Sequence, residues 1–173
     1  YREALETDRR TLGSRHPNTL TAINNLGQLL QIKGDLAAAK PLCREALERR
    51  RETLGDRHPD TLSSITDLSQ LLLDEGDLAA AEPLQREVLI VRRETLGSRH
   101  PSTLNSINTL GYLLKVKGDL AAAELLYREA LQVYRETLGD WHPITFMSIN
   151  HLGQLLKDKA KGDLVAAETT QWV

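Results

Sequence analysis

Apolar residues recur every three or four positions along most of the chain, with polar residues between them. The first series falls within residues 17–33, and its apolar positions are Leu20, Ile23, Leu26, Leu29 and Leu30. A second series falls within residues 35–52, and its apolar positions are Leu36, Ala39, Leu42, Cys43, Ala46 and Leu47. This spacing places each series on one face of an α-helix. No alternating run of β-branched and aromatic residues, which is typical of a strand, competes with it.

The residues between the two series mark the ends of the predicted helices. Pro17 suits the first position of a helix, where no N–H is needed, and His16 falls near the N-cap. Gly34 suits the left-handed residue that ends a helix, and Asp35 is a good N-cap for the next one. Because so short a connection makes neighbouring helices antiparallel, the pattern predicts a helix–turn–helix unit.

This unit repeats every 42 residues. The string Thr-Leu-Gly-x-Arg-His-Pro-x-Thr-Leu starts at Thr11, Thr53 and Thr95, and a degraded copy starts at Thr137. The last copy has Trp141 for arginine and two added residues near Lys159–Ala160. Such regular repetition predicts stacked units rather than one compact core. The predicted division is a partial second helix at 1–10, repeats at 11–52, 53–94 and 95–136, and a degenerate, truncated repeat at 137–173.

Composition and charge exclude several classes of protein. The chain has 22 basic and 24 acidic side chains and a net charge of -2, so it lacks the basic footprint of a nucleic-acid-binding protein. No apolar run approaches the roughly 18 residues of a membrane span. A single cysteine, Cys43, excludes an internal disulfide and leaves the cytoplasm as the expected location. The chain opens on Tyr1 rather than methionine, and we expect it to be part of a longer protein.

The residues that recur in each unit resemble the tetratricopeptide repeat, through Leu26-Gly27, Leu30, Ala39 and Ala46 in order. The 42-residue period and Leu-Gly-x-x-His-Pro before the first helix are similar to the repeats of kinesin light chains. This resemblance implies an all-α, right-handed superhelical solenoid of antiparallel helix pairs. It also implies a protein–protein interaction scaffold in which the first helices line a concave groove.

Candidate chemistry is sparse. His16, His58, His100 and His142 occupy one position of successive repeats, about 10 Å apart by helix packing, which is too far to share a metal ion. Cys43 lies on an apolar helix face, where a buried, inert thiol is the usual outcome. The arginines that end the second helices alternate with glutamates, which indicates a solvated, self-compensating face. We therefore predict no enzymatic activity, no cofactor and no metal.

The predicted binding surface is a stripe on the first helices, beside their core-facing stripe. Positions 21, 24, 28 and 31 share one helix face by the three-and-four rule, and the resemblance places their equivalents in the groove. Asparagine and glutamine both donate and accept, which suits binding the main chain of an extended peptide. Lysines near a tyrosine suit a segment that carries acidic residues beside an aromatic residue or leucine. The predicted groove residues are Asn24, Gln28, Thr66, Gln70, Asn105, Asn108, Tyr112, Lys115, Asn150, Gln154 and Lys157.

Two alternatives remain open at this stage. The stripe could be a polar, solvated wall without a ligand. The array could also be a structural spacer or assembly element that associates end to end, because both ends of the chain interrupt a repeat. Apolar positions at Leu5 and at Leu164, Val165 and Trp172 would then be exposed for self-association.

Overall fold

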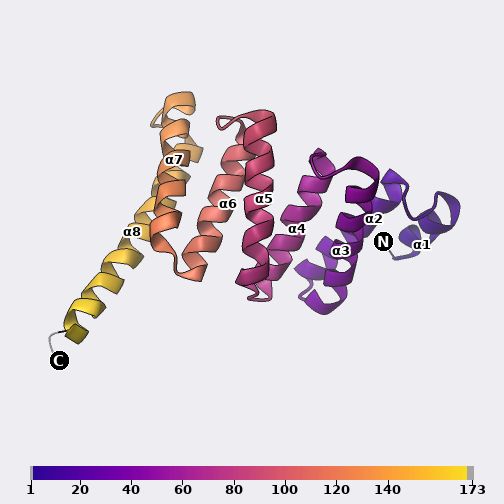
Figure 1. The fold of residues 1–173 in the computed structure, drawn as a ribbon, viewed down its shortest axis with the longest axis horizontal. Helices are drawn as coiled ribbons and strands as arrows, with labels where there is room; N and C mark the ends of the chain where they lie inside the picture. The colour runs from indigo at the N-terminus through magenta and orange to yellow at the C-terminus, as the bar shows by residue number, and fades with distance from the viewer. Residues whose placement is uncertain (1, 171–173) are drawn as a thin grey trace. The chain divides into compact units, whose positions relative to one another are not determined.

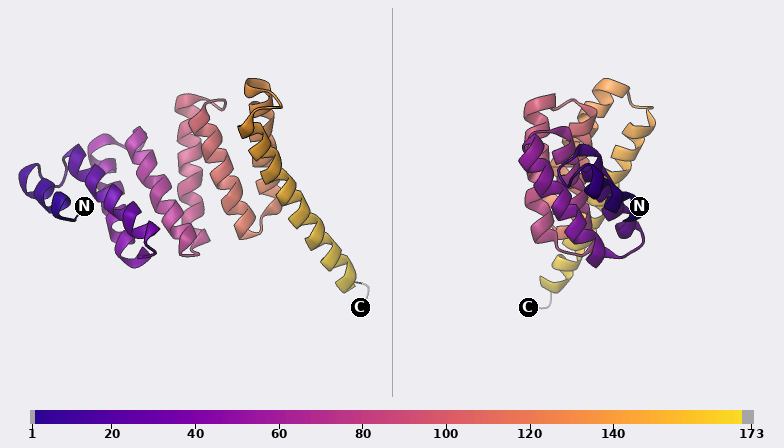
Figure 2. Two further views of the ribbon diagram at one scale, coloured as in Figure 1. Left: turned by 180° about the vertical axis from the view of Figure 1, so that it is seen from behind. Right: turned by 90° about the vertical axis from the view of Figure 1, so that its right-hand side faces the viewer.

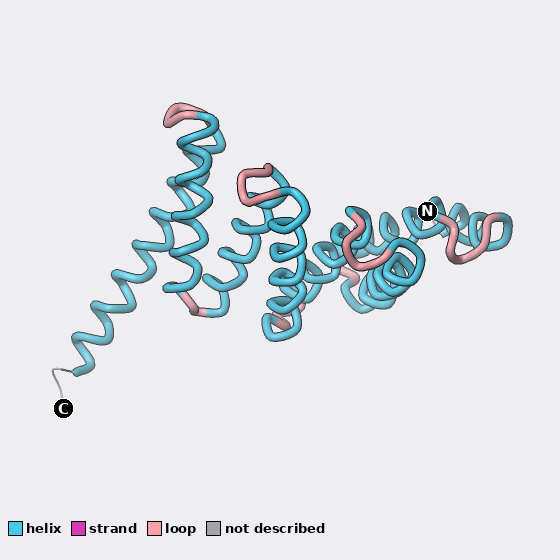
Figure 3. Tube along the Cα trace, turned by 45° about the horizontal axis from the view of Figure 1, so that its top comes forward, coloured by secondary structure: helices cyan, strands magenta, loops and turns pink. Residues whose placement is uncertain are grey.

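A computed structural model describes residues 2–170 of the chain. All regular structure in this range is helical, and short loops join the helices (Figure 3). The all-α prediction is therefore confirmed. The helices are α1 (Arg2–Thr11), α2 (Pro17–Ile32), α3 (Leu36–Leu54), α4 (Pro59–Asp74), α5 (Leu78–Leu96), α6 (Pro101–Lys117), α7 (Leu120–Leu138) and α8 (Pro143–Thr170).

The chain divides into two compact units, Tyr1–Val91 and Arg92–Val173, and the division falls inside α5. In the first unit, α2 packs on α3 and α3 packs on α4, while α1 packs on α2 (Figure 1). In the second unit, α6 packs on α7 and α7 packs on α8. The second helices α3 and α7 therefore each contact the first helix of their own repeat and the first helix of the next repeat.

The loop histidines start the first helices. At His16, His58 and His100 the backbone is extended, and the ring Nδ1 accepts a hydrogen bond from the backbone N–H two residues later. His142 makes the same contact with the N–H of Ile144, at 3.2 Å. A side-chain acceptor at this position satisfies one of the unpaired N–H groups of a helix start, so these histidines have a structural role.

Glycine and aspartate make the turn inside each of the first three repeats. Gly34 has a φ of +80°, in the left-handed region that glycine tolerates best. Asp35 then caps α3 by accepting a hydrogen bond from the N–H of Ala38 at 3.1 Å. Asp119 does the same for α7, where the donor is the N–H of Ala122. The helix boundaries predicted from these residues are confirmed to within two or three positions.

The core consists of leucine, isoleucine and alanine layers between helices. In α2 the buried apolar residues are Leu20, Ile23, Leu26 and Leu30, and in α3 they are Ala39, Cys43, Ala46 and Leu47. Small residues bring the paired helices close together. A Cβ added at Gly27 would lie 2.9 Å from the Cys43 Sγ, and one added at Gly111 would lie 2.8 Å from the Tyr127 ring.

Some arginines at the ends of the second helices are buried or half-buried, although the sequence predicted that they would be solvated. Arg50 is buried rather than solvated, and its Nη1 donates to the Ser64 hydroxyl at 2.7 Å and to the Asp60 carbonyl at 3.0 Å. Arg92 makes the equivalent bond to Ser106 at 2.7 Å, and burial lowers the pKa of its guanidinium. The interpretation of a wholly solvated arginine face was therefore wrong at these positions, because the first helix of the next repeat covers them.

A second class of arginine joins consecutive second helices by salt bridges. Arg9 meets Glu45 at 2.6 Å in the first unit. Arg51 binds Glu87 through both carboxylate oxygens, at 2.6 and 2.8 Å. In the second unit, Arg93 binds Glu129 in the same way, at 2.8 and 2.7 Å. We call these three pairs the arginine–glutamate ladder, and the two partners of each rung lie 36 residues apart in sequence.

Helix α8 departs from the repeat pattern. The first helices α2, α4 and α6 each end before a glycine turn, but α8 continues through Gly162 to Thr170 without a turn. It therefore extends past the end of its neighbour α7 (Figure 2). The two residues added near Lys159–Ala160 move Gly162 out of the position that Gly118 holds in the third repeat.

Leu5 is buried, which corrects the expectation that it would be exposed for self-association. It is covered because α1 packs on α2 in the place of a second helix from a preceding repeat. The other expected apolar positions, Leu164, Val165 and Trp172, lie outside the side chains that the structure describes. Within the described part of the chain, no helix has the length and apolar character needed to cross a membrane.

Candidate functional site

The predicted binding stripe is a wall of first helices, formed by α2 and α4 in the first unit and by α6 and α8 in the second. Asn24 is buried in the first unit rather than open to a ligand. Its Nδ2 donates to the Asp67 carboxylate at 2.8 Å, and its Oδ1 lies 3.5 Å from the Ser64 hydroxyl. Asn24 therefore joins α2 to α4 and does not present its amide to a peptide.

Further along this wall, amide side chains surround a carboxylate. Asp74 accepts hydrogen bonds from Gln31 at 2.6 Å and from Gln70 at 3.0 Å. Gln70 is exposed, while Gln28 and Thr66 are half-buried. Thr66 donates to the Leu62 carbonyl within its own helix. These groups border a hollow of about 300 Å³, whose lining is Gln28, Gln31, Ile32, Asp67, Gln70 and Asp74.

The wall of the second unit is more open. Asn105, Asn150 and Gln154 are exposed polar residues on α6 and α8. Tyr112 is 52% exposed, although most large apolar side chains of α6 are buried. Exposed amides can hydrogen-bond to a polypeptide main chain, and an exposed aromatic ring offers an apolar contact.

Asn108 lies on the same wall but supports the fold. Its Nδ2 donates to the Tyr134 hydroxyl on α7 at 3.3 Å. Tyr134 holds the position that Arg50 and Arg92 hold in the earlier repeats. Burial raises the pKa of the Tyr134 phenol, so the hydroxyl keeps its proton over a wide pH range. Asn108 is half-buried, and its Oδ1 is a buried acceptor without a protein hydrogen bond.

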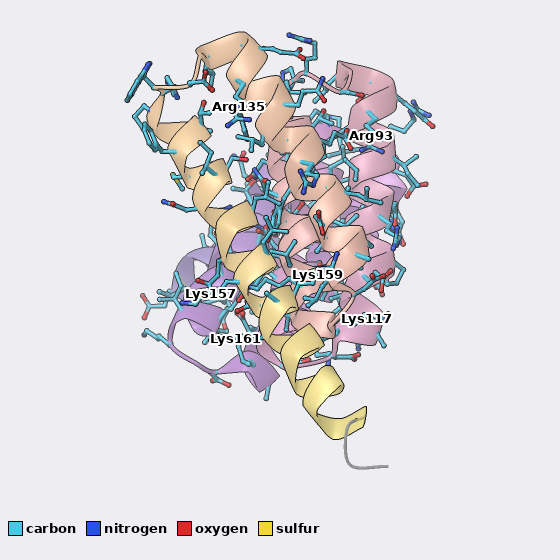
Figure 4. The ribbon with its side chains drawn as sticks, turned by 90° about the vertical axis from the view of Figure 1, so that its left-hand side faces the viewer. Arg93, Lys117, Arg135, Lys157, Lys159 and Lys161 are labelled. Carbon is cyan, nitrogen blue, oxygen red and sulfur yellow. The ribbon has the colours of Figure 1, made fainter. Side chains whose placement is uncertain are left out.

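The two lysines of the wall differ in their surroundings. Lys115 forms a 2.8 Å salt bridge with Asp158, and Gln154 donates to the same carboxylate at 2.9 Å. Hydrogen bonding to Lys115 holds the pKa of Asp158 below its usual value. Lys157 is exposed. Figure 4 labels Lys157 and Lys159 on opposite sides of α8, and Lys159 reaches Glu124 of α7 at 3.0 Å.

The sequence prediction missed the carboxylates that hold these walls together. Asp67, Asp74 and Asp158 each accept a hydrogen bond or salt bridge from a predicted groove residue or its neighbour on the preceding first helix. Each acceptor lies 43 residues after its donor, one residue more than the repeat period. A search for polar partners at that separation would have found them.

The described histidines and Cys43 do not form a metal site or a reactive nucleophile. Among the residues that the structure describes, no group of three or more histidine, cysteine, aspartate or glutamate side chains could hold a metal ion. Cys43 is 1% exposed, and burial raises the pKa of its thiol to about 11. A thiol with so high a pKa is protonated at neutral pH and is a poor nucleophile.

Comparison with known families identifies the repeat. A family model described as tetratricopeptide repeat matches residues 19–60, and a second model with the same description matches residues 70–136. These two matches span more than half of the chain. Neither model describes a catalytic family. No curated protein sequence matches the chain.

The fold of the chain is similar to the folds of several solved structures. One holds the nearly identical TPR-like repeats of a Podosopora anserina protein described as a kinesin light chain, with a TM-score of 0.84 and 24% identity over 98% of this chain and 81% of that chain. A variant of the same protein gives a TM-score of 0.85, again at 24% identity, over 98% and 80% of the two chains. BtubC (BKLC) from P. vanneervenii gives 0.80 at 22% identity, over 98% and 66%. At these identities the likeness concerns the fold alone.

Proposed function

Because the chain belongs to the tetratricopeptide repeat family, whose members are protein-interaction scaffolds, we propose that it binds an extended peptide segment of a partner protein along its first-helix wall. The observation that carries this proposal is the pattern of exposure on α6 and α8. On these helices one stripe is buried leucine and isoleucine, and the neighbouring stripe exposes amides and an aromatic ring.

The contacts divide the predicted groove residues into two groups. Asn24 and Asn108 are committed to Asp67 and Tyr134, so they hold the wall in shape. The residues proposed to touch the ligand are the exposed ones of the second unit, Asn105, Tyr112, Asn150, Gln154 and Lys157. Amide groups that are already fixed in a protein scaffold bind a peptide main chain at a lower entropic cost than mobile ones.

The charges on the wall suggest the chemistry of the ligand. Lys115 is neutralised by Asp158, so Lys157 is the cation that would meet a ligand carboxylate in the second unit. Tyr112 would contact an aromatic or leucine side chain of the same segment. We propose the cytoplasm as the place of action, because the single thiol is buried and needs no oxidising compartment.

The proposal is tested by screening immobilised unstructured peptides that pair acidic residues with an aromatic residue or leucine. For a bound peptide, Tyr112→Ala and Asn150→Ala should each weaken binding about five- to tenfold, or about 1–1.4 kcal/mol, as measured by fluorescence anisotropy. Glu48→Ala, an exposed change on the second helix α3, is the matched control and should leave the affinity unchanged. The idea fails if no peptide binds, or if a bound peptide responds to neither wall variant. The wall would then be solvated, as in the first alternative.

A further inference from the structure

Helix α8 carries an apolar stripe that no helix covers within the described part of the chain. Phe146 is 46% exposed and Leu156 is 37% exposed, whereas their equivalents in α6, Leu104 and Leu114, are buried. A Cβ added at Gly153 would meet nothing within 4 Å, in contrast to the equivalent glycines of α2 and α6, which contact their second helices. The stripe is therefore the surface on which a second helix packs in the earlier repeats.

This stripe forms one wall of a groove between α7 and α8. The groove has a volume of about 610 Å³, and its lining is Arg128, Leu131, Gln132, Arg135, Glu136, Ile149, Leu152, Gly153 and Leu156. A smaller hollow of about 460 Å³ also touches Arg135 and Ile149, and includes Trp141 and Phe146. We call this surface the α7/α8 groove. Its apolar floor and its size suit the side of an amphipathic helix.

The α7/α8 groove lies on a helix that does not turn at its glycine as the earlier first helices do. Helix α8 has two more residues before Gly162 than α6 has before Gly118. Two residues rotate a helix position by about 200°, so Gly162 lies on a different side of α8 from the side that Gly118 occupies at the end of α6. In the described part of the chain, α8 runs through Gly162 to Thr170, so no turn at this glycine supplies a second helix to the groove.

Arg135 indicates what charge a helix bound in the groove carries. It holds the position of Arg51 and Arg93, each of which binds a glutamate of the following second helix through both carboxylate oxygens. Arg135 lines the groove, and its Nε meets Asp140 at 3.0 Å, as Arg51 also meets Asp56. The next rung of the arginine–glutamate ladder therefore requires a glutamate from the occupant of the groove.

Helix α1 has the required sequence. Residues 1–10 match the second-helix segment 43–52, and Glu3 takes the position of Glu45, Glu87 and Glu129. Glu3 is exposed, so its carboxylate is accessible to a second molecule. Within the described residues, the first helix on which α1 packs is α2, whereas α3 packs on two first helices, α2 and α4, and α7 packs on α6 and α8.

We propose that the α7/α8 groove binds helix α1 of a second copy of this chain, with Arg135 paired to Glu3 of that copy. Helix α1 then packs between two first helices, as α3 and α7 do. The contact joins two different surfaces, so it is head to tail and open-ended, and one copy can follow another. Because one short helix fills the groove, the association is weak and visible at high protein concentration.

Sedimentation equilibrium of the full 173-residue chain, from micromolar to about 1 mM, tests the proposal. The weight-average mass should rise steadily with concentration rather than stop at a dimer. Glu3→Arg and Arg135→Glu should each weaken the association at least fivefold, and the double charge reversal should restore it. Glu48→Arg, a charge reversal outside the ladder, is the matched control and should have no effect.

Gly153→Leu provides a second test, because Gly153 lines the groove and a Cβ added there meets nothing within 4 Å, so the leucine side chain would occupy space that the bound helix needs. It should abolish the association and leave the circular dichroism helix signal intact. The proposal is overturned by a chain that stays monomeric at 1 mM, by a closed dimer, by association that survives Gly153→Leu, or by a double charge reversal that does not recover.

Discussion

Neighbouring arginines of α3 have different environments, and the difference comes from which side of the helix each one occupies. Arg50 points toward α4 and is buried, with hydrogen bonds to Ser64 and to the Asp60 carbonyl. The Arg49 side chain is 36% exposed and forms a salt bridge with Glu52 of its own helix, at 3.1 Å. Removing a buried guanidinium leaves its buried hydrogen-bond partners unpaired, which costs stability. Removing one partner of an exposed ion pair changes stability little.

We therefore expect Arg50→Ala to lower the free energy of unfolding by about 3 kcal/mol, since it removes two charge-assisted hydrogen bonds and opens a gap beside α4. Arg49→Ala, the matched control one residue away, should change it by less than about 0.5 kcal/mol. Urea unfolding followed by circular dichroism measures both. Equal effects of the two variants would contradict the assigned role of Arg50.

Cys43, which packs between α2 and α3, makes the stability of the fold depend on pH. Burial raises the pKa of its thiol from about 9 to about 11, so between these values the unfolded chain releases a proton that the folded chain retains. The unfolded state then binds fewer protons, and the contribution of Cys43 to stability falls as the pH rises. It is fully present below pH 9 and lost as the pH passes about 11.

The expected loss is on the order of 1–2 kcal/mol between pH 9 and 11, superimposed on the titration of other groups. Cys43→Ala removes the titrating group, so the variant should show a shallower decline over the same interval even though its stability at neutral pH is lower. Urea unfolding at stepped pH values measures the two slopes. Parallel slopes would show that the thiol does not contribute.

At the scale of helices, the distance between a first and a second helix depends on one small residue. Gly111 lies against the Tyr127 ring, and Gly27 lies against the Cys43 thiol. The equivalent Gly153 of α8 has no helix opposite it in the described part of the chain. Because the local sequence around these glycines is alike, comparison among them isolates the effect of helix packing.

Gly111→Ala should lower the free energy of unfolding by about 1–3 kcal/mol, because the new methyl group would lie 2.8 Å from a ring that cannot move far. Gly153→Ala should instead raise it by up to about 1 kcal/mol, since alanine favours helix and meets no clash. Thermal unfolding of both variants checks the opposite signs. Destabilisation by Gly153→Ala would mean that α8 is packed at that point in solution.

At the scale of the whole chain, the features that depend on local sequence could be predicted and those that depend on distant partners could not. Histidine caps, glycine turns and the leucine stripes all follow from residues within one helix pair, and the structure confirms them. Asn24 was expected to face a ligand, but it is buried because Asp67 lies opposite it. Position 67 differs in every repeat, so the repeat pattern alone could not identify that partner.

The same reasoning explains the errors at the two ends. Leu5 was expected to be exposed, yet α2 covers it because a fragment of a second helix is long enough to pack. The fourth repeat was recognised as degenerate, but its uninterrupted helix was not foreseen. Two added residues change the side of α8 on which Gly162 lies, and that effect depends on helix phase rather than on residue type.

The arginine–glutamate ladder has a consequence for how such a gene can change in length. Each rung joins residues 36 positions apart, and the partners recur at intervals of 42 residues. If recombination removed one interval of 42 residues, Arg9 would stand 36 positions before Glu87 and could pair with it as it now pairs with Glu45. Unequal crossing-over between repeats can therefore lengthen or shorten the array and keep the arginine–glutamate ladder in register.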